Sequence, residues 1–409
     1  MSRLPLAGRR VVHWAKFYPP HRGGMESVAA ALAQAACQDG ASVEVVAFDP
    51  ARRPAAAPPA DGLPAPRVLR CPVRWALASQ PLSWRYLWRA WRTARQASLV
   101  HLHAPNMLAL LPALLLPRQG PGRVPLVVHW HSDVVDKGWL GRLVAPLERA
   151  LLRRADRVIV TSAPYAQGSL RLRQVRGLRE RQRVVPIGVA APGAGRASPD
   201  PGDGAATLAG VQDWLAGRRL LLALGRLVPY KGFEVLLQAL TRVDPRAALV
   251  LVGQGPQADA LQAQVQALGL ADRVRLLPEV DDAGRDALLS AAQVFCLPSV
   301  ARAEAFGVVL VEAMAHGVPV VATHIPGSGV PWVNQHMVSG LNVPPGDAAA
   351  LAAALNQLLA DEPLRRHLAQ GARQRHQEAF SQARAWAATL AVYREVLPEN
   401  AGIRPVLPA

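Results

Sequence analysis

Two carboxylates stand alone in an apolar stretch of the chain. Residues 303–317 read AEAFGVVLVEAMAHG, in which Glu304 and Glu312 are the only Asp, Glu, Lys or Arg side chains. A helix is expected from about Phe306 to Gly317, because a strand pattern precedes it and a glycine ends it. Glu304 would be stabilised by the helix dipole, whereas Glu312 lies well inside the apolar helix. A carboxylate there needs hydrogen-bond donors, which the paired hydroxyls of a ribose would supply.

Two cations follow an earlier strand pattern in ALGRLVPYKGFE, residues 223–234. Arg226 and Lys231 lie in the loop that leads into a helix beginning near Gly232. The chain has lysine only at positions 16, 137 and 231, so a lysine here is an uncommon choice. Fixed cations in a water-poor site would neutralise the developing charge of a leaving diphosphate. Two solvated loop cations are the alternative interpretation.

Glycines stand at two further turns from a strand pattern into a helix pattern. They are Gly253 and Gly255 in VGQGPQ, and Gly23 and Gly24 in PPHRGGMES. At such turns the backbone can approach a ligand closely. VGQGPQ lacks the third glycine of the dinucleotide fingerprint, and the sequence has no phosphate loop that ends in Gly-Lys-Ser/Thr. The glycines alone are therefore a weak signal.

Histidines alternate in two strand patterns, HLH at residues 101–103 and HWH at residues 129–131. Alternate strand residues point the same way, so each motif puts two imidazoles on one face. That geometry could hold a metal, but Asp133 is the only obvious further ligand, so we expect packing near the strand ends and no metal site. A third interpretation places His131, at the carboxyl end of its strand, in contact with substrate.

Aromatic and basic residues interleave in PLSWRYLWRAWRTARQA, residues 81–97. As a helix, this segment would place three tryptophans along one side, with arginines beside them. That pattern suits a membrane interface with acidic headgroups, and packing of the tryptophans in the core is the alternative. No nucleic-acid-binding signature accompanies it. The candidate membrane or acceptor residues are Trp84, Arg85, Trp88, Arg89, Trp91 and Arg92.

Short apolar runs alternate with helix-period segments along the chain, which predicts an α/β fold with parallel sheets. A stretch rich in Ala, Pro and Gly interrupts the alternation, which then restarts. We therefore expect two doubly wound domains, with ligands at the carboxyl ends of the strands and in the cleft between the domains. The expected parts are a domain at 1–188, a linker at 189–217, a domain at 218–385, and a C-terminal helix and tail at 386–409.

The charge of the chain is uneven. Residues 1–192 contain 28 Lys and Arg against 10 Asp and Glu, whereas residues 193–409 contain 18 against 19. An anionic partner of the first half, such as acidic lipid, would explain this excess, and drift in an arginine-rich genome is the alternative. Three scattered cysteines and no signal-peptide pattern indicate a cytoplasmic protein that is soluble or peripheral at the membrane.

Several of these motifs together resemble one enzyme family. GRLVPYKG, VGQGP, and EAFGVVLVE followed by AMAHGVPVVAT look like the retaining GT-B glycosyltransferases often called family 4, which transfer sugars from nucleotide diphosphates. PPHRGGMES, VHWHSDVV and GSGVPWVNQHMVSGLNVPPGD resemble the members that build bacterial O-antigen and exopolysaccharide. The resemblance implies two Rossmann-like domains facing a central cleft, with C-terminal helices crossing back to the N-terminal domain.

The resemblance also implies roles for the second half of the chain. Arg226 and Lys231 would bind the donor diphosphate, Glu304 would contact hydroxyls of the donor sugar, and Glu312 would hold the nucleotide ribose. The donor would also meet the backbone near Phe306, Gly307, Val308, Gly253 and Gly255. Many family members have GG followed closely by Glu where this chain has GSGVPWVN, so the resemblance does not supply donor contacts there.

In the first half, Gly23 and Gly24 would let the backbone approach the diphosphate, and His131 would contact the donor sugar. The leaving phosphate would accept the proton of the acceptor, so neither a side-chain base nor a metal or other cofactor is expected.

The resulting hypothesis is a retaining transferase that moves mannose or a deoxyhexose from a GDP-sugar to a polyprenyl-linked saccharide. It would act at the anionic inner face of the cytoplasmic membrane and bind no nucleic acid. A UDP-sugar is the alternative donor. A sugar-nucleotide epimerase of the same architecture and a non-catalytic membrane-surface protein are the alternative functions.

Overall fold

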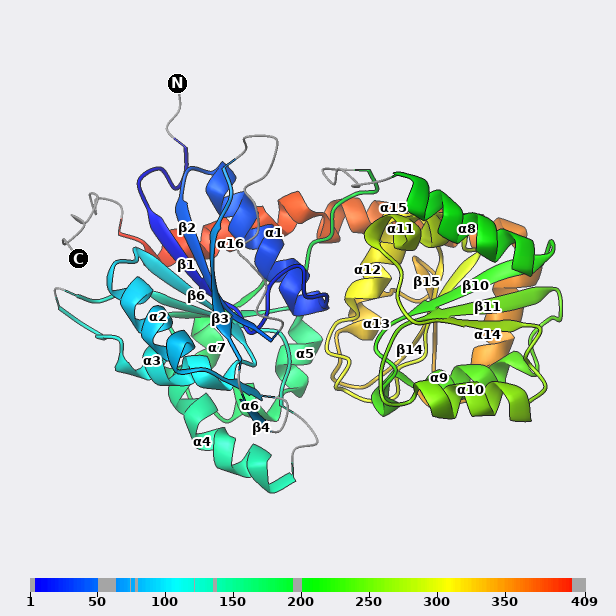
Figure 1. The fold of residues 1–409 in the computed structure, drawn as a ribbon, viewed down its shortest axis with the longest axis horizontal. Coiled ribbons are helices and arrows are strands. Elements are labelled where there is room, and N and C mark those ends of the chain that lie inside the picture. The colour runs from blue at the N-terminus through cyan, green and yellow to red at the C-terminus, as the bar shows by residue number, and fades with distance from the viewer. Residues whose placement is uncertain are drawn as a thin grey trace. The chain divides into compact units, whose positions relative to one another are not determined.

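A computed structural model describes residues 4–50, 64–73, 75–77, 80–120, 122–134, 138–193 and 201–398. The chain divides into two compact units. Unit 1 comprises residues 1–186 and 385–409, and unit 2 comprises residues 187–384. Each unit contains one parallel sheet with helices on both faces (Figure 1).

Unit 1 contains a seven-stranded parallel sheet in the order β3-β2-β1-β6-β7-β8-β9. Its strands are β1 (Arg10–Trp14), β2 (Ser42–Asp49), β3 (Arg67–Pro72), β6 (Leu99–Ala104), β7 (Leu126–Trp130), β8 (Arg157–Val160) and β9 (Gln182–Val184). A separate antiparallel pair consists of β4 (Trp75–Leu77) and β5 (Gln80–Leu82). The helices are α1 (Gly24–Gln38), α2 (Trp84–Arg95), η1 (Met107–Ala109), α3 (Leu110–Leu115), α4 (Gly138–Arg154), α5 (Ala163–Gly168), α6 (Leu170–Arg173) and α7 (Leu178–Arg181).

Helices α1 and α16 (Gln382–Val396) cover one face of this sheet. Strand side chains such as Val11, Leu99 and Val127 form one buried cluster with Ala29 and Tyr393 from these helices. The central strands are buried on both faces, which is why they read as continuous apolar runs. From Ala385 onward, α16 belongs to unit 1.

Unit 2 contains a six-stranded parallel sheet in the order β12-β11-β10-β13-β14-β15. Its strands are β10 (Arg219–Leu224), β11 (Ala247–Val252), β12 (Val274–Leu277), β13 (Val294–Leu297), β14 (Val320–Thr323) and β15 (Gly340–Val343). Its helices are α8 (Pro201–Leu215), η2 (Pro229–Lys231), α9 (Phe233–Leu240), α10 (Ala258–Ala267), α11 (Asp282–Ala291), α12 (Val308–Ala315), α13 (Val330–Val333), α14 (Ala348–Ala360), α15 (Glu362–Arg375) and the π-helix η3 (His376–Phe380).

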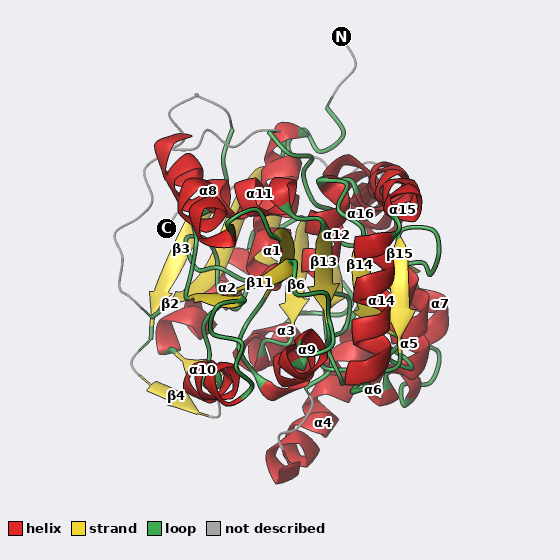
Figure 2. Cartoon of the chain, turned by 90° about the vertical axis from the view of Figure 1, so that its right-hand side faces the viewer, coloured by secondary structure: helices red, strands yellow, loops and turns green. Residues whose placement is uncertain are grey.

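Helices α9, α10 and α14 cover one face of the unit 2 sheet, and α11 and α12 lie on the opposite face (Figure 2). Leu236, Leu261 and Leu355 from the first group form one buried cluster with Leu221 and Leu249 of the strands. The predicted α/β fold with two doubly wound parallel sheets is confirmed.

The strand orders locate the expected ligand sites. In each sheet the order reverses beside the first strand of the unit, between β1 and β6 in unit 1 and between β10 and β13 in unit 2. Loops that leave the carboxyl ends of two such strands diverge to opposite faces and open a crevice for ligands. The site residues should therefore follow β10 and β13 in unit 2, and β1 and β6 in unit 1.

One sequence expectation was wrong within the expected linker at 189–217. Residues Pro201–Leu215 form helix α8, which packs against α11. Val211 and Leu215 are buried on one side of α8, and the alanines favour a helix despite the flanking Pro and Gly. Residues 194–200 of the expected linker and 399–409 of the expected tail lie outside the described residues. No described helix is both long enough and apolar enough to cross a membrane.

Candidate functional site

The loops after β10 and β13 bring a lysine and a glutamate together. Lys231 Nζ lies 2.6 Å from Glu304 Oε2, and each side chain is only 10% exposed. Ser299 Oγ donates a hydrogen bond of 3.0 Å to the same carboxylate oxygen. The pair therefore lies at the position where the strand order of unit 2 predicts a ligand.

Close backbone contacts hold these two loops together. Gly232 has a φ of +67°, and a Cβ atom on it would lie 2.2 Å from the carbonyl oxygen of Pro298. The amide of Val300 donates a hydrogen bond of 2.8 Å to the carbonyl of Tyr230. Glycine is therefore required beside Lys231, because any side chain would push the two loops apart.

The segment around Glu304 is also fixed from the β14 side. Ser328 Oγ donates a hydrogen bond to the backbone carbonyl of Glu304, and the amide of Gly329 donates one of 2.8 Å to Ala305. These bonds position the carboxylate before any ligand arrives. A rigid site of this kind stabilises charge without reorganisation during a reaction.

A pre-formed ion pair can serve a polar ligand. The Lys231 ammonium has three N–H donors, which suit the oxygens of a phosphate, and the Glu304 carboxylate accepts bonds from hydroxyl groups. Arg226 is exposed in the same loop and adds a second positive charge. The arrangement can therefore bind a ligand that carries both phosphate and hydroxyl groups.

Glu312 lies in the middle of α12, as predicted, but it is not enclosed by apolar groups. Its side chain is 18% exposed, and Arg285 Nη1 of α11 lies 3.8 Å from its Oε1. Arg285 also pairs with Asp282 and Asp286 at 3.1 Å. Arg285 had no sequence signal as this partner, because it reaches α12 only through the packing of two helices.

The helix near Glu304 begins two residues later than predicted. Helix α12 starts at Val308, and Gly307 is its N-cap with a φ of +80°. Phe306 is buried and packs against Trp332 and Phe380, so its ring belongs to the core. Amides in the first turn of a helix lack intrahelical partners and attract anions.

The other predicted glycines permit close backbone contacts. A Cβ atom on Gly253 would lie 1.9 Å from the carbonyl oxygen of Gly225, and one on Gly255 would lie 2.3 Å from that of Leu227. Both glycines thus allow the loops after β10 and β11 to touch. In unit 1, Gly23 caps helix α1 and Gly24 is its first residue.

Five buried histidines are stacked on the face of the unit 1 sheet that α1 and α16 cover. Neighbouring rings have centroids 4.0–5.6 Å apart. His103 connects two neighbours, because its Nε2 lies 3.1 Å from Nδ1 of His13 and its Nδ1 lies 3.1 Å from Nε2 of His131. The stack consists of His13 of β1, His101 and His103 of β6, His129 of β7, and His131 directly after β7.

Burial lowers the pKa of all five imidazoles. The pKa falls to about 3 for both His13 and His131. The five rings are therefore neutral at neutral pH, when each nitrogen either carries a proton or offers a lone pair. His131 follows a strand end as predicted, and the common face of each histidine pair is confirmed.

Helix α2 places its tryptophans outward. Trp84, Trp88 and Trp91 are 84%, 54% and 39% exposed, while Tyr86 and Ala90 on the other side are buried. Packing of these tryptophans in the core is therefore excluded. The guanidinium of Arg92 lies over the ring of Trp88, and that of Arg95 lies over the ring of Trp91.

One arginine of this segment has a structural role. Arg89 is half-buried, and its Nη1 donates a hydrogen bond of 2.6 Å to the carbonyl of Arg70 in β3. It ties α2 to the sheet, so it is less available for a surface contact than the exposed arginines of this helix. Arg85 and Arg92 are exposed, as a contact role requires.

An apolar pocket adjoins the start of α2. Its volume is about 960 Å³. Trp75 is 74% exposed beside it, and Leu111 is 46% exposed. The pocket is lined by Pro72, Trp75, Leu82, Ser83, Trp84, Arg85, Leu87, Leu108 and Leu111. The pocket and the exposed apolar side chains that line it are a candidate binding region.

Comparison with known proteins identifies the family. Residues 210–375 match the family described as "Glycosyl transferases group 1", and residues 23–188 match the "Glycosyl transferase 4-like domain". The chain is 31% identical to D-rhamnosyltransferase WbpZ of Pseudomonas aeruginosa over 91% of its own length and 92% of that protein. The chain belongs to the group 1 glycosyltransferases. It is also 28% identical to O-antigen chain mannosyltransferase C of Escherichia coli, over 91% of this chain and 94% of that one.

Solved structures give the same fold for this glycosyltransferase. Anabaena HepE, solved in complex with UDP and glucose, matches with a TM-score of 0.73 at 22% identity, over 95% of this chain and all of that one. Together with the two parallel sheets, this likeness assigns the GT-B fold.

Three functional candidates of this glycosyltransferase were absent from the sequence analysis. Ser299 and Arg285 orient the two predicted glutamates, and His13 joins the predicted histidines. His13 lies in a strand pattern, but its register with His101 on the neighbouring strand is visible only in the structure. Ser299 and Arg285 had no local signal, since their contacts depend on loop and helix packing.

Proposed function

We propose that this glycosyltransferase retains the anomeric configuration and transfers mannose or a deoxyhexose from a GDP-sugar to a lipid-linked oligosaccharide. The observation that carries the proposal is the buried Lys231–Glu304 pair at the switch point of unit 2. A phosphate-binding cation and a hydroxyl-binding carboxylate at one point fit a nucleotide-diphosphate sugar, whose sugar is attached directly to its diphosphate.

The proposed reaction needs little side-chain chemistry. The acceptor hydroxyl forms a bond to the anomeric carbon as the bond between that carbon and the diphosphate oxygen breaks. The leaving phosphate accepts the acceptor's proton on the same face, which preserves the configuration. Lys231 and Arg226 neutralise the charge that develops on the diphosphate, and Glu304 holds hydroxyls of the donor sugar.

Further residues complete the proposed donor site. Glu312 accepts hydrogen bonds from the ribose hydroxyls, and its side chain is 18% exposed, so such a ligand can reach the carboxylate. His131 contacts the donor sugar, and the backbone near Gly24 approaches the diphosphate. These assignments follow the family resemblance and require no metal at the diphosphate.

Mannosyl and rhamnosyl transfer by the two similar proteins supports the GDP-sugar. The complex of HepE with UDP makes a UDP-sugar the competing donor. The O-antigen function of the E. coli relative supports a place in the synthesis of bacterial surface polysaccharide.

Unit 1 carries the proposed acceptor and membrane surface. The exposed rings of Trp84 and Trp88 and the nearby Arg85 and Arg92 suit the boundary between acidic headgroups and acyl chains. The adjoining apolar pocket suits the first isoprene units of a polyprenyl carrier. We therefore propose a peripheral position on the inner face of the cytoplasmic membrane.

The test is a nucleotide-release assay. Purified protein is incubated with GDP-mannose, GDP-rhamnose, UDP-glucose or UDP-galactose, each with and without a membrane lipid extract. We expect GDP release that depends on the extract, and a lipid-linked product whose anomeric configuration matches the donor. No nucleotide release with any donor from folded protein contradicts transfer. Conversion of the donor without an acceptor would indicate an epimerase.

A further inference from the structure

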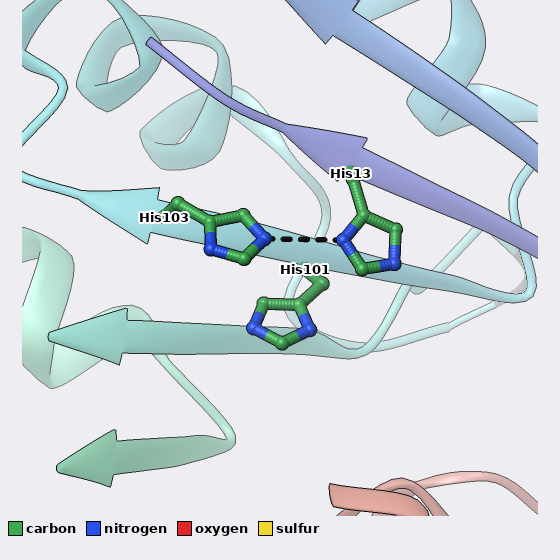
Figure 3. Close-up of side chains that lie close together, drawn as sticks. All are labelled: His13, His101 and His103. Atoms are coloured by element: carbon green, nitrogen blue, oxygen red, sulfur yellow. Dashed lines mark hydrogen bonds between the residues drawn. The ribbon is translucent and has the colours of Figure 1, made fainter. Parts of the chain in front are cut away.

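Three buried histidines of unit 1 converge from two neighbouring strands. His13 of β1 and His101 and His103 of β6 each offer a ring nitrogen, and these three nitrogens lie within 4.8 Å of one another (Figure 3). We propose that His13, His101 and His103 bind one divalent transition-metal ion, with Zn²⁺ as the first ion to test. The site belongs to unit 1 and is separate from the proposed metal-free diphosphate site.

The spacing of the nitrogens suits metal coordination. His13 Nδ1 and His103 Nε2 are 3.1 Å apart. Two nitrogens bound to a tetrahedral zinc ion are about 3.3 Å apart, because each Zn–N bond is about 2.0–2.1 Å long. The pair is therefore nearly in place, and the third nitrogen has to approach by a small side-chain rotation. Three histidines with one exchangeable ligand form a known zinc arrangement.

Hydrogen bonds behind the ligands favour the same site. Metal-bound histidines nearly always donate their second ring N–H to an acceptor, which fixes the ring and its tautomer. His101 Nδ1 lies 2.6 Å from the hydroxyl of Tyr393, and His103 Nδ1 lies 3.1 Å from Nε2 of His131. Two of the three proposed ligands therefore already have outer partners, with their Nε2 atoms left for the metal.

Unsatisfied nitrogens point to a missing partner. His101 Nε2 is fully buried and has no hydrogen-bond partner among the described residues, and the same holds for both ring nitrogens of His129. Burying a polar atom without a partner destabilises the folded chain. A metal ion at the three histidines would supply the partner of His101 Nε2.

The chemistry of the ligands restricts the ion. Neutral imidazoles bind Zn²⁺, Cu²⁺, Ni²⁺ and Co²⁺, whereas Mg²⁺ and Ca²⁺ need oxygen ligands. A second group, His103, His129 and His131, also brings its nitrogens within 4.8 Å. We favour the first group because Tyr393 supports it and because it leaves His131 unbound.

A metal at this site would determine which ring nitrogen of His131 carries the proton. With His103 Nε2 on the metal, His103 Nδ1 must carry the proton and donate a hydrogen bond to His131 Nε2. His131 then carries its own proton on Nδ1, which becomes a hydrogen-bond donor. This consequence rests on the proposed role of His131 with the donor sugar, whereas the metal site itself does not.

The experiment measures metal binding directly. Full-length protein without a polyhistidine tag is stripped with a chelator and titrated with Zn²⁺ against a chromophoric competitor, and separately with Co²⁺ while visible d–d bands are recorded. We expect one equivalent of Zn²⁺ per chain and a tetrahedral Co²⁺ spectrum. A chain that binds no stoichiometric Zn²⁺ would overturn the proposal.

Variants identify the ligands. His13→Gln and His103→Gln should each weaken Zn²⁺ binding at least 100-fold, and Tyr393→Phe, which keeps the ring in place, should weaken it about tenfold. His376→Gln, a buried histidine of unit 2, is the matched control and should bind as the unaltered chain does. Circular dichroism confirms folding of each variant. The proposed ligand set would be overturned if Tyr393→Phe and His13→Gln kept their Zn²⁺ affinity while His129→Gln lost it.

Discussion

Ser299 sets the position of the carboxylate that carries the proposed chemistry. Its hydroxyl donates to Glu304 Oε2 from a buried position, while Lys231 contacts the same oxygen. Two donors on one oxygen leave the other oxygen of Glu304 for hydroxyls of the ligand. We therefore expect Ser299 to position Glu304 without taking part in the reaction itself.

We predict that Ser299→Ala lowers kcat/KM about 10-fold to 150-fold, because a hydrogen bond to a charged group contributes about 1.5–3 kcal/mol. Ser299→Thr, which keeps the hydroxyl, should restore much of the loss. Initial rates at a series of donor concentrations measure the effect. Ser290→Ala, at an exposed serine contact of unit 2, is the control. Equal rates for Ser299→Ala and the control would contradict the positioning role.

The site residues that were predictable from the sequence all lie in short local motifs. Lys231 and Glu304 stand in short motifs directly after strand patterns, and topology alone then predicts that they meet. Ser299, Arg285 and His13 escaped because their roles come from contacts across loops, helices and strands. Periodicity shows on which face of a helix or strand a residue lies, but it does not show which residue of another element lies beside it.

At the scale of elements, the loop from β10 to α9 depends on one glycine. We predict that Gly232→Ala lowers the free energy of unfolding of unit 2 by at least about 2 kcal/mol, because a left-handed φ and a contact with Pro298 both oppose a side chain. It should also weaken donor binding, since Lys231 is the adjacent residue.

Gly210 provides the matched control. It lies inside α8 with open space around its Cα, so Gly210→Ala should stabilise unit 2 by about 0.5–1 kcal/mol. Calorimetric unfolding of both variants tests the pair. A stable, active Gly232→Ala protein would show that the two loops can separate without harm.

Helix α2 carries the prediction about membranes. Replacing Trp84 and Trp88 together by Ala should reduce binding to vesicles that contain acidic phospholipid by at least tenfold, because both rings are more than half exposed. Co-sedimentation measures this binding. Leu170→Ala changes an exposed apolar residue elsewhere in unit 1 and should have no effect. If the variant without Trp84 and Trp88 binds vesicles as well as Leu170→Ala does, helix α2 is not the membrane contact.

The elements also show where composition misleads. Strands and most helices were predictable because buried parallel strands are continuous apolar runs between helix-period segments. Helix α8 was missed because Pro and Gly at its start outweighed its alanines. The late start of α12 reflects Gly307, whose left-handed φ cannot be read from apolar periodicity.

At the scale of the whole molecule, the two units should respond differently to acid. The five stacked histidines of unit 1 have lowered pKa values, so the unfolded chain binds protons near pH 6.5 that these folded side chains do not. The stability that these five side chains contribute is therefore complete above pH 6.5 and falls as the pH drops below it. Each histidine contributes up to about 1.4 kcal/mol per pH unit.

Hydrogen exchange of metal-stripped protein at pH 7.5 and pH 5.5, corrected for intrinsic rates, tests this asymmetry. Peptides from β1, β6 and β7 should lose protection at the lower pH, while peptides from β10 and β11 keep more of theirs. Equal losses in both units would contradict the role of the buried histidines.

The central claim is that Lys231 binds the diphosphate of a sugar donor. Titration calorimetry with the preferred nucleoside diphosphate and its monophosphate tests it most directly, in Glu304→Gln and in Lys231→Met combined with Glu304→Gln. Removing both charges avoids a buried, unpaired carboxylate. We predict that Glu304→Gln keeps the diphosphate affinity, whereas the double variant loses at least tenfold for the diphosphate and much less for the monophosphate. Equal diphosphate affinity of the two folded variants would contradict the account.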